Sequence, residues 1–122
     1  MPVRSLRSSI LRWPDRSDVD SAVRAWAREQ ARIRPGLVRP GYFGSYATGN
    51  WGVGSDLDSV AVVASCARPF GERALEWDLT KLPVPAEILI YTTAEWARVL
   101  QKQDRFARVM SKEVVWVNET PD

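Results

Sequence analysis

Residues 44 to 58 carry the feature that most limits the fold of this chain, a glycine-punctuated segment that leads directly into a valine-rich run. Four of the eleven residues from Gly44 to Gly54 are glycine, which indicates a loop with tight turns. The run that follows, Leu57 to Ala64, is rich in β-branched residues and is preceded by Gly-Ser-Asp, a pattern typical of a strand. The chain is therefore expected to leave a loop and enter a sheet at this point.

The remaining sequence predicts helices and strands in alternation around that strand. A capping box at Ser17-Asp18-Val19-Asp20 opens a helix with an apolar stripe, and Pro35-Gly36 ends it. The other predicted elements are a strand at 37–43 that Pro40-Gly41 shortens or bulges, a short helix opening at Ser45, a helix at 72–81, a strand at 86–91, a helix that a capping box opens at Thr92 and that continues or restarts through Met110, and a strand at 114–117. We expect one α+β (α/β) domain, residues 1–122, with a mixed β-sheet flanked by helices and with 1–16 as a peripheral N-terminal extension.

Composition excludes several classes of chemistry. The chain has no histidine, which excludes His-based triads, imidazole bases and His-containing zinc sites. Cys66 is the only cysteine, so an intramolecular disulfide cannot form, and a small buried apolar role is expected for it. Any catalysis must therefore rest on carboxylates, hydroxyls and basic groups.

Charge and hydropathy limit the partners. The formal net charge is only +2 and the charges are interspersed, whereas a protein that coats a polyanion is usually more lopsided. No apolar run is long enough to span a bilayer, and the Arg-rich segment from Met1 to Pro14 does not resemble a signal peptide. We expect a cytoplasmic protein with no membrane segment, and a solvated N-terminal face rather than a nucleic-acid arm at Arg4, Arg7, Arg12 and Arg16.

Two short motifs in the glycine-rich segment suggest phosphate and metal chemistry. Gly44-Ser45 follows a predicted strand and precedes a short helix, where backbone N–H groups and the Ser45 hydroxyl suit a phosphate. Asp56 and Asp58 lie two apart at the entry to a strand, so both carboxylates point the same way and suit Mg²⁺. Each motif alone has an ordinary alternative, a simple turn or a solvated acidic pair. Their joint spacing, with ten residues between them, is much rarer by chance.

This spacing resembles the signature of the DNA polymerase beta-like nucleotidyltransferase superfamily, most closely its minimal nucleotidyltransferase, antitoxin-type branch. The resemblance implies that Gly44 and Ser45 hold a nucleoside triphosphate and that Asp56 and Asp58 bind two Mg²⁺ ions. It also implies a third carboxylate on a later strand, for which Glu87 is the candidate, since it opens a predicted apolar strand. The order of elements is similar over about positions 17–117, but only the segment from Gly44 to Asp58 is specific.

Four positions leave alternatives open. Many family members carry arginine where Thr48 stands and a hydrophobic residue where Ser59 stands, and their third carboxylate is often aspartate. Asp78, on the predicted 72–81 helix, is the second candidate for that carboxylate. Trp51, within the glycine-rich loop, could stack on a base or a partner.

The resemblance implies transfer of a nucleoside monophosphate, AMP from ATP, to a hydroxyl, with pyrophosphate released. In the antitoxin-type branch the acceptor is a tyrosine of a small helical partner toxin. Two alternatives are a catalytically inactive partner-binding module of the same fold and, less favoured, a basic nucleic-acid-binding domain. The sequence leaves the base, the acceptor and the formation of a homo-oligomer open.

Overall fold

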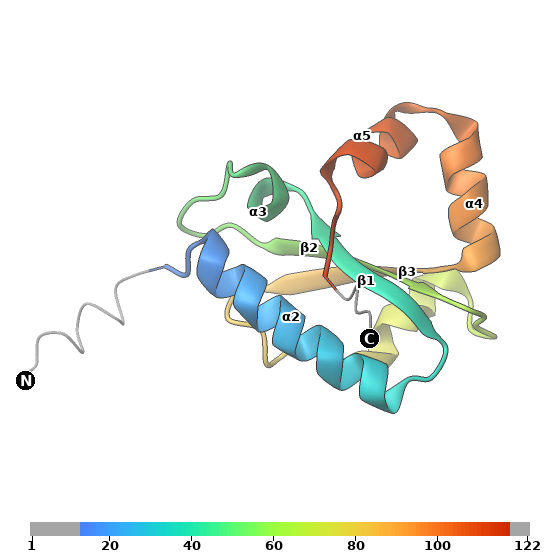
Figure 1. Cartoon of the computed structure of the whole chain (residues 1–122), viewed down its shortest axis with the longest axis horizontal. Coiled ribbons are helices and arrows are strands. Elements are labelled where there is room, and N and C mark those ends of the chain that lie inside the picture. The colour runs from blue at the N-terminus through green and yellow to red at the C-terminus, as the bar shows by residue number, and fades with distance from the viewer. Residues whose placement is uncertain (1–12, 118–122) are drawn as a thin grey trace, which may run out of the picture.

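The computed structural model describes residues 13–117, which form a four-stranded β-sheet with helices on both faces (Figure 1). In chain order the elements are α2 (Arg16–Ile33), β1 (Leu37–Phe43), α3 (Ser45–Thr48), β2 (Leu57–Val63), the 3₁₀ helix η1 (Phe70–Glu76), β3 (Ala86–Thr92), α4 (Thr93–Lys102), α5 (Arg105–Glu113) and β4 (Val115–Trp116). The strand order is β3-β2-β1-β4, with β2 and β3 parallel and β1 antiparallel to both of its neighbours. The expected mixed sheet flanked by helices is therefore confirmed.

Some expectations fall outside the described part of the chain. Residues 1–12, which include Arg4, Arg7 and Arg12, belong to the segment expected to form an N-terminal extension, and they lie outside the described residues. Arg16 is the first residue of α2, and its guanidinium donates a hydrogen bond to the Ala47 carbonyl at 3.0 Å. Across 13–117, no helix combines the length and the apolar character that crossing a bilayer would require.

The N-terminus of α2 is capped by Asp15 and not, as predicted, by Ser17. The Asp15 carboxylate accepts from the Asp18 N–H at 2.9 Å, and the Asp18 carboxylate accepts from the Asp15 N–H at 3.1 Å. Asp20, the acidic member of the predicted box, instead accepts from the Tyr42 hydroxyl at 2.7 Å. Burial and this hydrogen bond raise the pKa of Tyr42 to about 12. The hydrogen bond from Tyr42 of β1 therefore occupies Asp20, and the capping box forms between Asp15 and Asp18 instead of between Ser17 and Asp20.

Strand β1 continues through Pro40-Gly41, so the prediction that this dipeptide shortens or bulges the strand was wrong. The irregularity in its pairing with β2 lies between Leu37 and Arg39. Gly41 allows β4 to approach closely, because a Cβ atom there would lie 2.7 Å from the Val115 carbonyl oxygen. The pairing of β1 with β4 is extended by one hydrogen bond, in which the Val117 N–H donates to the Pro40 carbonyl at 3.0 Å.

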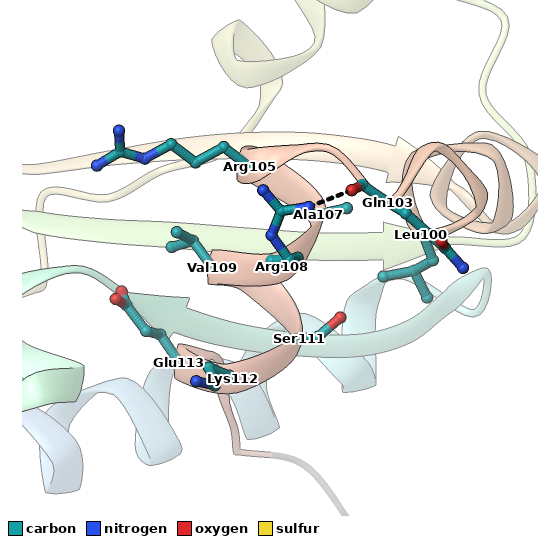
Figure 2. A pocket seen from close by; sticks show the side chains of 9 residues that line it. All are labelled: Leu100, Gln103, Arg105, Ala107, Arg108, Val109, Ser111, Lys112 and Glu113. Carbon is teal, nitrogen blue, oxygen red and sulfur yellow. Dashed lines mark hydrogen bonds between the residues drawn. The ribbon is translucent and has the colours of Figure 1, made fainter.

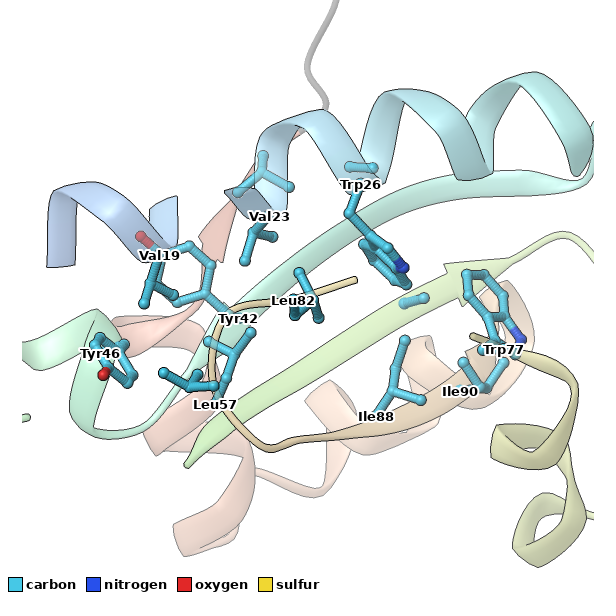
Figure 3. Packing of buried hydrophobic residues seen from close by; sticks show 14 of the residues in the cluster. Val19, Val23, Trp26, Tyr42, Tyr46, Leu57, Trp77, Leu82, Ile88 and Ile90 are labelled. Atoms are coloured by element: carbon cyan, nitrogen blue, oxygen red, sulfur yellow. The ribbon is translucent and has the colours of Figure 1, made fainter. Parts of the chain in front are cut away.

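Each face of the sheet has its own apolar core. On one face α2 packs through Val19, Val23 and Trp26 against side chains of the strands and of the segment that follows η1 (Figure 3). On the other face Trp96 of α4 and Met110 of α5 pack against Val60 and Val62 of β2. Side chains alternate along a strand, so Asp58 lies on the same face as Val60 and Val62. The helices α4 and α5 therefore cover the face of the sheet that carries Asp58.

The predicted helix at 72–81 is wrong. A 3₁₀ helix ends at Glu76, and Trp77 has an extended backbone that places its ring in the core, 5.9 Å from that of Trp26. Leu75, within the same segment, is 81% exposed. A regular helix would not place Trp77 in this core position, so tertiary packing overrode the helical pattern.

An ion pair between the buried Arg73 and the partly buried Glu95 fastens η1 to the start of α4. The Arg73 guanidinium donates to both carboxylate oxygens of Glu95, at 2.6 and 3.1 Å, and to the Ile90 carbonyl at 3.0 Å. Glu95 also completes the capping box with Thr92 that the sequence predicted. Hydrogen bonds from Arg73 are the main cause that lowers the pKa of Glu95 to about 2. After α4, Gln103 adopts a left-handed conformation and α5 restarts with Asp104 as its cap.

Candidate active site

The turn at Gly44-Ser45 lies directly against the second aspartate. Gly44 has φ +78° and ψ −151°, a backbone conformation essentially restricted to glycine, and α3 begins at Ser45 as predicted. Phe43 and Asp58 are paired across β1 and β2, which brings the Asp58 carboxylate beside the turn. A Cβ atom at Gly44 would overlap Asp58 Oδ2. The candidate phosphate-binding turn and a candidate metal ligand are thus in contact.

Glu87 lies beside Asp58 on the neighbouring strand. The two residues are register partners in the parallel pair β2–β3, so their side chains leave the sheet on the same face. Burial, followed by the charges of Glu87 and Asp56, raises the pKa of Asp58. The charges of both other predicted carboxylates therefore act on Asp58, and a cation at this point would relieve that repulsion.

The side chains as they stand do not form a closed metal cage. Asp56 and Glu87 are exposed and Asp58 is half-buried. Within the described segment, no three carboxylate, cysteine or histidine side chains converge in an arrangement that would hold a metal ion. Mg²⁺ is commonly held by one or two carboxylates together with substrate phosphates, so the donor set fits an ion that arrives with a nucleotide.

Tyr46 anchors the glycine-rich loop, a role that the sequence did not indicate. Its side chain is fully buried. Its hydroxyl accepts a hydrogen bond from Trp13 Nε1 at 2.8 Å and donates one to the Pro14 carbonyl at 3.1 Å. Trp51 stacks on the Tyr46 ring with centroids 5.7 Å apart and planes 8° apart. One face of Trp51 is therefore already covered within the protein, which favours a structural role over stacking on a base.

Of two other positions named from the sequence, Asp78 has a structural role and Ser59 is buried. Asp78 does not lie on a helix: its carboxylate accepts from the Thr80 N–H at 2.9 Å and from the Thr80 hydroxyl at 2.6 Å, which builds a turn. Ser59 is 2% exposed, and its hydroxyl has no hydrogen-bond partner among residues 13–117. Ser59 lies on the face opposite Asp58, because neighbouring strand residues alternate.

Comparisons with known proteins identify the fold. No family model matches the chain, and no curated protein matches it either. Among solved structures, a protein from Sulfolobus solfataricus described as a "putative nucleotidyltransferase" aligns with a TM-score of 0.59 over 94% of this chain and 87% of that one, at 17% sequence identity. The chain has a nucleotidyltransferase-like fold. At this level of identity, the likeness describes the architecture and leaves the chemistry to be argued from the residues.

Within this nucleotidyltransferase-like fold, a Gly44→Ala substitution is expected to destabilise the protein by about 2–3 kcal/mol, because alanine cannot adopt the glycine-only backbone conformation without strain and its Cβ would displace the Asp58 carboxylate. Urea denaturation measures the change. Gly52→Ala is the matched control, since Gly52 lies in the same loop with no heavy atom near its would-be Cβ. Equal losses in the two variants would contradict a specific role for Gly44.

Proposed function

We propose that the chain is a Mg²⁺-dependent nucleotidyltransferase that transfers a nucleoside monophosphate, AMP from ATP, to an acceptor hydroxyl. The observation that carries this proposal is the contact between the Gly44 turn and the Asp58 carboxylate, with Glu87 in register beside Asp58. A phosphate-binding turn and adjacent carboxylates at one point are the components that transfer at phosphorus requires.

The triphosphate would bind at the start of α3. The Ser45 hydroxyl stands at that start, and the absence of a side chain at Gly44 lets the Asp58 carboxylate lie against the same turn. Asp56, Asp58 and Glu87 would hold two Mg²⁺ ions together with those phosphates. When bound, Mg²⁺ neutralises negative charge on the attacking and leaving oxygens of an in-line displacement.

The chain's own residues account for the rest of the reaction. The acceptor oxygen would form a bond to the α-phosphorus while the bond from that phosphorus to the bridging oxygen breaks, and pyrophosphate leaves with that oxygen. Glu87 would take the proton of the acceptor hydroxyl, since the chain has no histidine to serve as base. Glu87 is exposed, which suits contact with an incoming acceptor.

The acceptor that we propose is a tyrosine of a small helical partner protein. The support for it is the resemblance of the Gly44-Ser45 and Asp56-Asp58 spacing to antitoxin-type minimal nucleotidyltransferases. A protein acceptor would bring its own surface to complete the site.

Transfer of the α-phosphate is tested directly with labelled ATP. Antitoxin-type minimal nucleotidyltransferases are often encoded beside their helical partner, so the assay contains Mg²⁺ and a small helical protein from a neighbouring gene. Label from the α position should appear on that protein, and label from the γ position should leave as pyrophosphate. Total tRNA in place of the protein should take up no label. Retention of γ label would mean phosphoryl transfer and would overturn the proposal.

A catalytically inactive partner-binding module is the second candidate. It is favoured by the exposure of Asp56 and Glu87 and by the lack of a closed three-ligand group among residues 13–117. ATP binding without transfer of label from either position would support it over the enzyme.

A further inference from the structure

A pocket of about 580 Å³ opens at the hairpin formed by α4 and α5, and none of the candidate site residues lines it (Figure 2). Its apolar part is formed by Leu100 near the end of α4 and by Ala107 and Val109 of α5. Leu100 is 38% exposed and Val109 is half-buried, so apolar surface of both remains accessible. The pocket can therefore accept an apolar side chain from outside.

Positive charge surrounds this apolar part. Arg105, Arg108 and Lys112 line the pocket, against one carboxylate, that of Glu113. Within residues 13–117, neither Arg105 nor Lys112 forms an ion pair. The Arg108 guanidinium donates to the Gln103 carbonyl at 2.6 Å, a neutral partner that leaves its charge uncompensated.

Two other acidic side chains of the hairpin form no ion pair with these cations in the described part of the chain. Glu95 is paired with Arg73 and completes the cap of α4. Asp104 accepts from the Ala107 N–H at 2.9 Å and caps α5. The hairpin therefore presents a basic rim around an apolar centre, which is complementary to an acidic segment that carries an apolar side chain.

The hairpin covers the face of the sheet that carries the candidate carboxylates. Trp96 and Met110 pack against Val60 and Val62. These two valines point to the same face of the sheet as Asp58, because every second residue of a strand shares a face. A protein bound to the hairpin would accordingly lie on the side of the sheet from which Asp58 and Glu87 project.

We propose that the α4–α5 pocket docks an acidic segment of the acceptor protein. An apolar side chain of that segment packs against Val109, and its flanking carboxylates pair with Arg105 and Lys112, which share one face of α5 with Val109 (Figure 2). The segment is protein and not nucleic acid, because no aromatic side chain lines the pocket to stack on a base. That the docked protein is also the acceptor rests on the proposed function, whereas docking of the segment requires no catalysis.

The test uses a short fluorescein-labelled glutamate-rich peptide with leucines one helical turn apart, and fluorescence anisotropy without nucleotide. The parent protein should bind it, and Arg105→Glu/Lys112→Glu should weaken binding about tenfold or more, because each substitution replaces attraction to the peptide carboxylates with repulsion. Replacing the peptide leucines with serine should weaken binding to a similar degree. Arg28→Glu/Lys81→Glu makes the same charge change at exposed positions outside the pocket and should leave the affinity unchanged.

Three outcomes would overturn the docking proposal: failure of the parent protein to bind the peptide at low salt, equal weakening in the two double variants, or tighter binding of an oligothymidine that the pocket variant loses. ATP binding with Mg²⁺ is measured separately on the same proteins. Failure of the proposed function would appear as absence of ATP binding, or of α-label transfer, by the parent with peptide binding intact. Failure of the docking proposal would appear as absence of peptide binding by the parent with ATP binding intact.

Discussion

Asp58→Asn is expected to lower nucleotidyl transfer by roughly a thousandfold, because metal-assisted stabilisation of the transition state is worth several kcal/mol. Asparagine keeps the shape of the side chain beside Gly44 but removes the charge that a divalent cation requires. The fold should remain intact, and the metal-free variant should melt at the same temperature as the parent or higher, since burial and the charges of Glu87 and Asp56 disfavour an ionised Asp58. Initial rates with α-labelled ATP and thermal melts measure both effects.

Ligand stabilisation gives a second measurement for the same variant. Mg²⁺ with ATP should raise the melting temperature of the parent and should raise that of Asp58→Asn far less. Asp78→Asn serves as the control, because Asp78 builds a turn with Thr80 and asparagine forms the same kind of turn. If Asp58→Asn retained full activity and full stabilisation, the metal assignment would be wrong.

Glu95→Gln is expected to destabilise the protein by about 3 kcal/mol, because it leaves the Arg73 guanidinium buried without its anion. Such a loss corresponds to a drop in melting temperature of about 10 °C for a domain of this size. Arg73 is 6% exposed and its two bonds to Glu95 hold η1 against β3 and α4. Glutamine still completes the capping box with Thr92, so the variant isolates the charge from the cap. Urea denaturation at neutral pH measures the change in the free energy of unfolding.

The pH dependence of folding stability tests the Arg73–Glu95 pair independently. The pKa of Glu95 is lowered to about 2 in the folded protein, below its ordinary value in an unfolded chain. Its contribution is therefore fully present above the unfolded pKa and is lost as the pH falls toward about 2. Glu95→Gln should show a smaller loss of stability than the parent between neutral and acidic pH.

Two controls separate the buried pair from a general effect of charge. Glu29→Gln removes the partner of Arg32 in an exposed pair on α2 and should leave stability unchanged within error. The double variant Arg73→Met/Glu95→Gln should recover part of the loss, because no unpaired buried charge remains. Equal losses for Glu29→Gln and Glu95→Gln would contradict the buried-pair interpretation.

Local sequence signals determined the elements whose residues interact with near neighbours. The glycine-rich segment predicted both the turn at Gly44 and the short helix at Ser45, and the Thr92 capping box predicted the start of α4. The valine-rich run predicted β2, because β-branched residues at that density suit a buried strand. These predictions depend on backbone preferences and hydrogen bonds within a few residues, which the order of amino acids specifies directly.

The tertiary structure decided the features that depend on distant segments. Asp15 caps α2 because Asp20 is engaged by Tyr42 of β1. In place of the predicted helix at 72–81, a 3₁₀ helix ends at Glu76 because Trp77 packs on Trp26. The sequence named Asp58 and Glu87 separately, but only the parallel register of β2 and β3 made them neighbours. Local preferences are worth fractions of a kcal/mol for each residue, whereas burial of a large side chain is worth about 1.5–3 kcal/mol, so packing between distant segments prevails where the two conflict.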